Sequence, residues 1–189
     1  MNTKIQYALT NKAEFDRKNS AFVCIDLQEK LFAVMKNKEK LKINTQKLLK
    51  ASELLGVLNI ICEQYPKGLG SSVVQSVANT KRIEKLTFSA FGEQSFLEIL
   101  QKDSINTLIL FGIESHICVR STALDAKRNG FRVVVVGDAI SSRSKKNHKL
   151  CLEELRAKGV EILSTESVLF SFLWSCKEAD FKNISPLIK

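Results

Sequence analysis

A cysteine placed shortly after a buried strand is the residue with the clearest chemical potential in this chain. Residues 108–113 (LILFGI) form an unbroken apolar run, which predicts a buried parallel strand. Ser115 is a good N-cap residue, and apolar residues at helical spacing predict a helix from there to Gly130. Cys118 then falls in the first turn, where the helix dipole would lower the pKa of its thiol and favour a thiolate nucleophile. The alternative is a small apolar side chain packed on the strand.

Two charged residues also stand where predicted strands end. Asp26 closes the apolar segment 21–28, and a partly buried carboxylate with a raised pKa could accept the proton of a thiol. The alternative role for Asp26 is to cap a turn. Lys85 ends a weaker strand at 81–85, and most lysines in a lysine-rich chain are simply solvated. Between Asp26 and Cys118, however, Lys85 would keep the carboxylate ionised and lower the pKa of the thiol.

Strands alternate with helices along the chain, which predicts parallel strands joined by right-handed crossovers. We therefore expect a single α/β domain over residues 1–189, a Rossmann-like three-layer sandwich with a mostly parallel central sheet. In such sheets ligands bind beyond the carboxyl ends of the strands, where Asp26, Lys85 and Cys118 would converge. The predicted strands are 21–28, 59–64, 81–85, 108–113, 131–136 and 160–164, and the predicted helices are 39–55, 71–79, 93–102, 115–130, 146–158 and 167–176, with a loop at 65–70.

Length and composition bound the class of protein. The chain has 189 residues, 44% of them hydrophobic, which is enough for one domain with a sizeable core. No stretch approaches the length of a membrane span, and the first twenty residues lack the apolar core of a signal peptide. The five scattered cysteines without a CxxC pair favour free thiols in a reducing compartment. We therefore expect a cytoplasmic protein without membrane partners.

The formal net charge of +9 raises the question of nucleic-acid binding. The densest lysine run, from Lys36 to Lys50, shares its predicted helix with an apolar face, so a solvated helix surface is favoured. No nucleic-acid motif or aromatic platform accompanies these lysines. No nucleic-acid partner is expected, and a basic RNA-associated protein remains as an alternative.

The two histidines give no sign of a metal site. His116 and His148 form neither an HxH nor an HExxH pattern, and no acid or cysteine stands at ligand spacing from them. The Gly68-x-Gly70 pair lacks the third glycine of a dinucleotide fingerprint, and the chain has no Walker loop or GxSxG elbow. We therefore expect no metal and no cofactor.

Several segments together resemble the isochorismatase-like cysteine hydrolases. The likeness covers nearly the whole chain after Ala21 and is closest to the isochorismatase domain-containing subgroup. The matching segments are VCIDLQ around Asp26, EKLTFSAF around Lys85, GIESHICVRSTALDAKRNGF around Cys118, VVVVGDAISSRS, STESVLF, EQYPKGLG (63–70) and FKNISPLIK (181–189).

The resemblance implies a reaction and a role for each residue. Asp26 would take the thiol proton, Lys85 would orient that carboxylate, and Cys118 would attack a carbonyl to form an acyl-enzyme. The backbone N–H groups of Ile117 and Cys118 would bind the oxyanion. The family also has a non-proline cis peptide bond before the cysteine, which corresponds here to Ile113–Glu114.

The resemblance also bears on the substrate. The nicotinamidase branch binds a metal through an aspartate and two histidines, and this chain has no histidine in the corresponding segments. A metal-independent hydrolase acting on a small amide or related carbonyl compound is therefore expected, with a catalytically silent binding or scaffold protein as the alternative. A homo-oligomer is also expected. The candidate substrate-contacting residues are Phe32, Tyr65, Phe88, Glu114 and His116, and core packing is an equal alternative for the aromatic ones.

Overall fold

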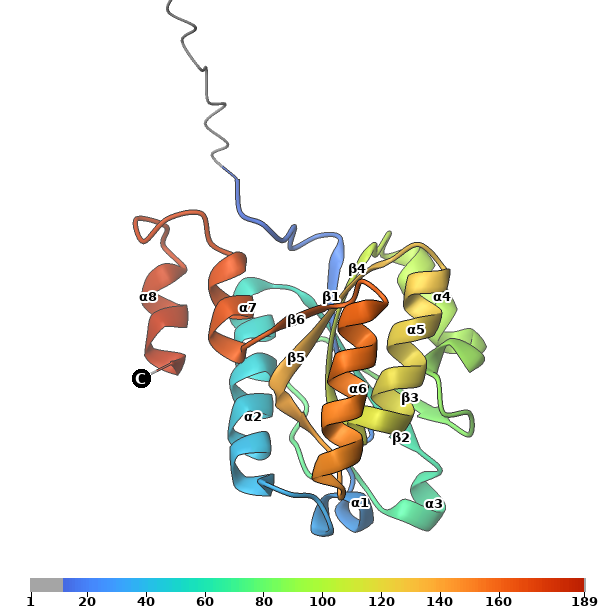
Figure 1. Cartoon of the computed structure of the whole chain (residues 1–189). Helices are drawn as coiled ribbons and strands as arrows, with labels where there is room; N and C mark the ends of the chain where they lie inside the picture. The colour runs from blue at the N-terminus through green and yellow to red at the C-terminus, as the bar shows by residue number, and fades with distance from the viewer. Residues whose placement is uncertain (1–11, 189) are drawn as a thin grey trace, which may run out of the picture.

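A six-stranded sheet forms the centre of the molecule (Figure 1). The structure is a computed structural model and describes residues 12–188. All neighbouring strands are parallel, in the order β3-β2-β1-β4-β5-β6. The order reverses between β1 and β4, and this is where open α/β sheets bind ligands. The strands are β1 (Ser20–Ile25), β2 (Leu58–Gln64), β3 (Thr80–Lys85), β4 (Thr107–Ile113), β5 (Arg132–Ser141) and β6 (Glu161–Leu163).

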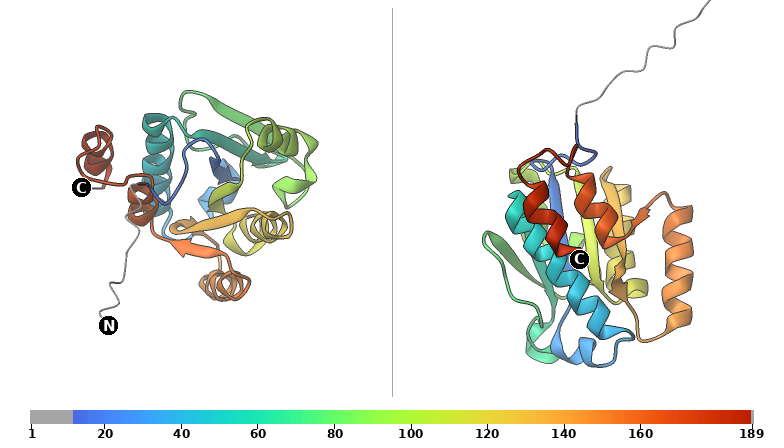
Figure 2. Two further views of the ribbon diagram at one scale, coloured as in Figure 1. Left: turned by 90° about the horizontal axis from the view of Figure 1, so that it is seen from above. Right: turned by 90° about the vertical axis from the view of Figure 1, so that its left-hand side faces the viewer.

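Helices cover both faces of the sheet, so the predicted three-layer α/β arrangement is confirmed. Seen from above, α2 and α7 lie on one side of the sheet and α4, α5 and α6 on the other (Figure 2). The helices are α1 (Glu29–Ala33), α2 (Lys38–Leu55), α3 (Pro66–Leu69), α4 (Gln94–Lys102), α5 (Arg120–Arg128), α6 (Lys145–Ala157), α7 (Thr165–Ser171) and α8 (Phe181–Ile184). In the part of the chain that the structure describes, none of them has the length and apolar character needed to cross a membrane.

The core lies on both faces of the central strands. Every residue of β1 and β4 is buried, as their unbroken apolar sequences predict. Phe22 of β1 stacks on Phe172 with 5.5 Å between ring centroids and meets Phe111 of β4 edge-on at 6.3 Å. Helix α2 buries Leu41, Leu48 and Leu55 and leaves most of its lysines in solvent, as the sequence indicates.

Several local predictions differ from the structure; the strand predicted at 131–136, for example, continues to Ser141. Residues 71–79 form no helix, because Val73 N donates to Leu27 O (2.8 Å) and Ser72 pairs with Gln28, so the segment is held by the loop after β1. Residues 65–70 contain the single-turn α3 instead of a plain loop. The C-terminal helix predicted at 167–176 is α7, which begins earlier because Ser164 caps it by accepting from Ser167 N at 3.1 Å, and which ends at Ser171 instead of Cys176.

Candidate functional site

Asp26 is the first buried charge at the carboxyl edge of the sheet. It follows β1 directly, and its side chain is wholly inaccessible to solvent. Its backbone has φ +48°, a left-handed conformation that non-glycine residues seldom adopt. Its N–H donates to Cys62 O (3.0 Å), and its carbonyl accepts from Gln28 N (2.7 Å). These two bonds hold the residue in the left-handed conformation at the point where the chain leaves the strand.

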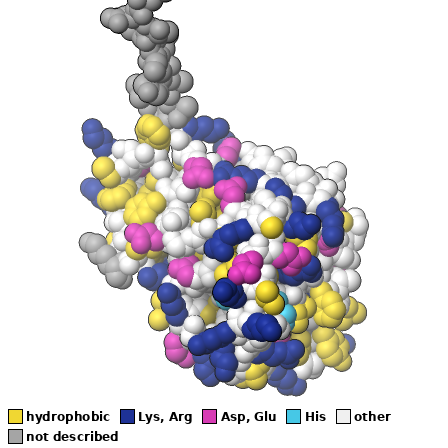
Figure 3. All heavy atoms as spheres, in the orientation of Figure 1, with side chains coloured by type: hydrophobic (Ala, Val, Ile, Leu, Met, Phe, Trp, Pro, Cys, Tyr) yellow, Lys and Arg dark blue, Asp and Glu magenta, His cyan; other side chains and the backbone are white. Residues whose placement is uncertain are grey.

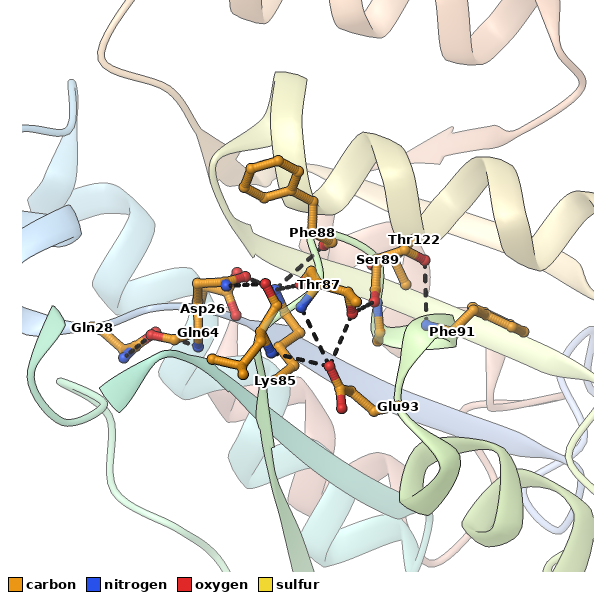
Figure 4. A network of polar contacts seen from close by, with 12 residues as sticks. Asp26, Gln28, Gln64, Lys85, Thr87, Phe88, Ser89, Phe91, Glu93 and Thr122 are labelled. Atoms are coloured by element: carbon orange, nitrogen blue, oxygen red, sulfur yellow. Dashed lines mark hydrogen bonds and ion pairs between the residues drawn. The ribbon is translucent and has the colours of Figure 1, made fainter. Parts of the chain in front are cut away.

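Lys85 reaches this carboxylate from the end of β3, two strands away (Figure 4). Its Nζ donates to Asp26 Oδ2 at 2.7 Å, and both side chains are buried. Nζ also lies 2.6 Å from Gln64 Oε1, 3.2 Å from Thr87 O and 3.3 Å from Phe88 O. The three N–H groups of the ammonium are therefore all directed at protein acceptors. Lys85 can fix and neutralise the carboxylate, and it has no N–H to spare.

Gln64 is a site residue that the sequence reasoning missed. It ends β2, and its side chain bridges Lys85 Nζ and Leu86 O, the latter at 2.8 Å. Its backbone is clamped by Gln28, which accepts from Gln64 N (2.7 Å) and donates to Gln64 O (3.0 Å). The available signal was an uncharged amide at the carboxyl end of a buried parallel strand, next to Asp26 in the predicted sheet.

Cys118 lies in a widened turn that precedes α5. Residues Ser115–Val119 form a π-helical turn, with Glu114 instead of Ser115 at the N-cap. The Ile113–Glu114 peptide bond is cis, as the resemblance implied. Glu114 O accepts from both Ile117 N (3.1 Å) and Val119 N (3.3 Å). The Ile117 N–H, predicted as an oxyanion donor, is thus bonded within the turn. The Cys118 N–H remains the candidate donor.

The three predicted reactive side chains form one electrostatic cluster. Burial raises the pKa of the Asp26 carboxyl, while Lys85 opposes that shift. Burial, reinforced by the charge of Asp26 and opposed by Lys85, raises the pKa of Cys118 to about 12. The lowered thiol pKa expected from the helix dipole is therefore wrong, because desolvation and the neighbouring carboxylate dominate. Cys118 is only 6% exposed and carries its proton at neutral pH.

One oxygen of Asp26 is left for this thiol or for a ligand. Oδ2 is bound by Lys85, whereas Oδ1 is buried and has no hydrogen-bond partner within residues 12–188. The Cys118 side chain lies close enough to lower the pKa of this carboxyl. An unpaired buried carboxylate oxygen is costly, so its presence beside a protonated thiol marks a position for proton transfer.

The three aromatic residues predicted to line the substrate pocket all follow strands at the carboxyl edge of the sheet, but their environments differ. Phe32 on α1 is half-buried and packs against the core. Tyr65 lines a hollow of 380 Å³ together with Lys85 and Glu93. Phe88 is 63% exposed, and its ring points away from the Lys85–Asp26 pair while its carbonyl faces Lys85 (Figure 4).

Glu114 and His116, predicted as substrate contacts, form hydrogen bonds with the loop that follows β5. The Glu114 carboxylate is buried and accepts from Arg143 N at 3.0 Å. His116 Nδ1 lies 2.9 Å from Ser142 Oγ, and its ring lines a hollow beside α6. Both side chains therefore bind the loop between β5 and α6.

A second cluster of polar side chains supports the π-helical turn that carries Cys118. Ser115 Oγ bonds to Ser142 Oγ and lies 3.0 Å from His148 Nδ1. The Cys151 thiol donates to Ser115 O at 3.0 Å. Burial and the nearby His116 lower the pKa of His148. Both histidines of the chain thus belong to this support of the Cys118 turn, which residue spacing could not reveal.

The remaining chemistry-bearing residues are dispersed. All five cysteines are free thiols, and four of them are buried. Among residues 12–188, no three His, Cys, Asp or Glu side chains are grouped so as to hold a metal ion.

Known proteins resemble the chain over most of its length. A family model described as the isochorismatase domain matches residues 20–167. Isochorismatase domain-containing protein 1 of Danio rerio is 33% identical over 187 residues, which are 98% of this chain and 66% of that protein. The chain therefore spans about two thirds of that relative's length. Isochorismatase domain-containing protein 2 of Danio rerio is 34% identical over 172 residues, 90% of this chain and 87% of that protein.

The fold is also found among solved structures. The structure titled MAR1 ribonuclease from Caenorhabditis elegans superimposes with a TM-score of 0.87 at 31% sequence identity. The match covers 92% of this chain and 91% of that one.

Proposed function

Because this chain belongs to the isochorismatase family, we propose that it is a hydrolase that uses Cys118 as a nucleophile against a small amide or a related carbonyl compound. Family membership supports a hydrolase. The observation that carries the thiol mechanism is the buried Asp26–Lys85 ion pair at 2.7 Å, whose second carboxylate oxygen is free beside the thiol.

The first step forms a thioester. The sulfur of Cys118 bonds to the substrate carbonyl carbon while the S–H proton passes to Asp26 Oδ1. The raised pKa of Asp26 makes it a stronger proton acceptor than an exposed carboxylate. Negative charge develops on the carbonyl oxygen, and the Cys118 N–H at the start of the helix stabilises it. As the C–N bond breaks, the departing amine takes the proton from Asp26.

The second step releases the acid. Water loses a proton to Asp26 as its oxygen attacks the thioester carbon, and the C–S bond then breaks while the proton returns to sulfur. Lys85 keeps the carboxylate in place throughout. We propose a metal-independent reaction because both histidines are hydrogen-bonded to serines, His148 to Ser115 and His116 to Ser142.

A screen of small aliphatic and aromatic amides for ammonia release tests this proposal. Cys118→Ala should lose at least about a thousandfold in rate, while the exposed Cys176→Ala variant serves as a matched control with wild-type rate. Mass spectrometry should detect an acyl adduct on the peptide that carries Cys118. Wild-type turnover in Cys118→Ala would refute the nucleophile. The absence of both turnover and adduct would favour the scaffold alternative.

A second candidate is an RNA-associated function. It is favoured by the ribonuclease title of the similar Caenorhabditis elegans structure and by the net charge of +9. Filter binding and cleavage of single-stranded RNA at physiological salt test it, because electrostatic binding to phosphates weakens steeply with salt. Retention and cleavage of RNA there would favour this candidate over the amidase.

We also propose that the chain forms a homo-oligomer. Leu86 is 74% and Phe88 is 63% exposed, and both residues lie in the segment directly after β3. Light scattering should give a multiple of 21.2 kDa for the wild type and a smaller mass for Leu86→Ser/Phe88→Ser. A monomeric wild-type mass would exclude this assembly.

A further inference from the structure

A cavity separate from the thiol opens at the same edge of the sheet. It has a volume of 260 Å³ and lies between the starts of α2 and α6, over the end of β5. Neither Asp26, Lys85 nor Cys118 lines it. Its mouth carries three lysines, and its floor is made of buried serine hydroxyls. These residues are Lys36, Lys40, Lys145, Ser141 and Ser142.

The charge around this cavity is strongly one-sided. Lys and Arg side chains gather over the starts of α2 and α6 in the space-filling view (Figure 3). Within residues 12–188, none of the three lining lysines has a carboxylate partner. The one acidic lining residue, Asp138, has Oδ1 occupied by Thr165 N (2.7 Å) and Thr165 Oγ1 (2.8 Å). The cavity is therefore lined by three ammonium groups and a single carboxylate, which forms no ion pair with any of them.

The backbone adds to this positive field. Helices α2 and α6, of 18 and 13 residues, both begin at the cavity. The first N–H groups of a helix have no intrahelical acceptor, and the dipole places partial positive charge there. Asn37, the N-cap of α2, makes no side-chain capping bond, so the N–H groups at that end are not capped by it. At the start of α6 the Ser144 hydroxyl accepts from Asn147 N at 3.2 Å, so one of the first N–H groups of that helix is already bonded. The positive ends of two helices and three lysines still meet at this cavity, and such an arrangement favours anions.

We propose that this cavity is a binding site for a small phosphomonoester. A phosphate ester carries about −1.5 to −2 charges and three acceptor oxygens at neutral pH, which match three ammonium groups. The volume of 260 Å³ is below the range of about 300–1,000 Å³ for drug-sized ligands, so a small metabolite fits and a nucleic-acid strand does not.

The site is connected to the Cys118 turn. Its floor residue Ser142 bonds to Ser115 and His116, and its wall residue His148 bonds to Ser115. A ligand that contacts the floor therefore touches the support of the turn that carries Cys118. Binding itself requires no hydrolysis, so it can be tested whether or not the amidase proposal holds.

Calorimetric titration with glycerol phosphate and with inorganic phosphate in 150 mM NaCl tests the site. The test variant Lys40→Ser/Lys145→Ser removes one lysine from each helix. The control Lys42→Ser/Lys149→Ser removes the same charge from the same helices at positions that do not line the cavity. We expect saturable one-to-one binding that weakens at least tenfold in the test variant and less than twofold in the control. Unfolding temperatures establish that both variants fold.

Three results would overturn the proposal. The first is that the wild type shows no saturable binding, and the second is that binding of glycerol phosphate weakens equally in the test and control variants. The third is that a single-stranded RNA displaces glycerol phosphate and that the affinity for this RNA falls equally in both variants. The last result would mean that the lysines are a diffuse nucleic-acid surface. Tighter binding of glycerol phosphate than of inorganic phosphate identifies an ester as the ligand, whereas the reverse order identifies free phosphate. The first order supports the proposal, and the reverse order would overturn the assignment to an ester.

Discussion

Two charged regions at the same edge of the sheet are organised in opposite ways. In the Asp26–Lys85 region opposite charges are buried 2.7 Å apart, and every N–H of the ammonium has an acceptor. In the lysine-lined cavity three lysines outnumber the one lining carboxylate, Asp138, and none of them forms an ion pair within the described residues. In the first region the opposite charges neutralise each other without a ligand, whereas the second region has an excess of positive charge. The difference distinguishes a place suited to chemistry from a place suited to binding.

The largest effect on stability should come from removing one partner of the Asp26–Lys85 ion pair. Lys85→Met leaves the Asp26 charge buried without its cation, and such a loss typically costs about 3–5 kcal/mol. Urea unfolding should show this decrease in the free energy of unfolding, and Asp26→Leu/Lys85→Met should recover most of it. A loss below about 1 kcal/mol in the single variant would contradict the view that the pair is buried and mutually dependent.

The raised pKa of the thiol gives the second prediction. Because Cys118 titrates at about 12 and is 6% exposed, iodoacetamide at pH 8 should modify it on the order of a hundredfold more slowly than the exposed Cys176. Its labelling rate should still be rising between pH 9 and 11, because the thiolate fraction grows towards the pKa. Peptide mapping measures both sites in one sample. Selective labelling of Cys118 at pH 5.5 would instead establish an activated thiolate.

A glycine behind Asp26 offers a sharper test of how that region is positioned. Gly112 has φ +115°, and a Cβ there would lie 2.1 Å from Ile25 O, next to Asp26. Gly112→Ala should therefore destabilise the protein by about 3 kcal/mol, combining a backbone clash with an unfavourable φ. Gly130→Ala, at φ +82° with open space, is the matched control and should cost about 1 kcal/mol. Equal costs would show that the backbone of β1 can yield.

The smallest effect is expected at the cavity lysines. Lys40→Ser/Lys145→Ser should change the free energy of unfolding by less than about 0.5 kcal/mol, in the stabilising direction, because it reduces repulsion between exposed cations. Added phosphate should raise the unfolding temperature of the wild type and leave this variant nearly unchanged. A marked loss of stability in the variant would mean that the lysines are structural.

The sequence was sufficient for features that depend on strand order and burial. Apolar runs located β1 and β4, and the rule that ligands lie beyond parallel strands brought Asp26, Lys85 and Cys118 to one edge. It was insufficient where a side chain's direction depends on its neighbours. His116 is two residues from Cys118, yet it faces Ser142, because the widened turn rotates it away.

The prediction of a lowered pKa for the Cys118 thiol was wrong for a related reason. The helix start was visible in the sequence, but the desolvation of Cys118 and the nearness of the Asp26 charge depend on packing between distant strands. The role of Gln64 could not be predicted for the same reason, because the sequence does not show which cation a glutamine side chain will contact in the fold. Local pattern thus predicts which elements exist, whereas the balance of charge at their ends requires the assembled fold.

The saturated ammonium of Lys85 has a consequence for the order of events in the proposed reaction. With all its N–H groups held by Asp26, Gln64 and two carbonyls, it is not placed to hand a proton to a departing amine. A single carboxyl oxygen must then carry every proton in turn, outward with the first product and back to sulfur with the second. Because this oxygen can hold only one proton at a time, it can accept a proton from water only after the first product has left with the proton from the thiol.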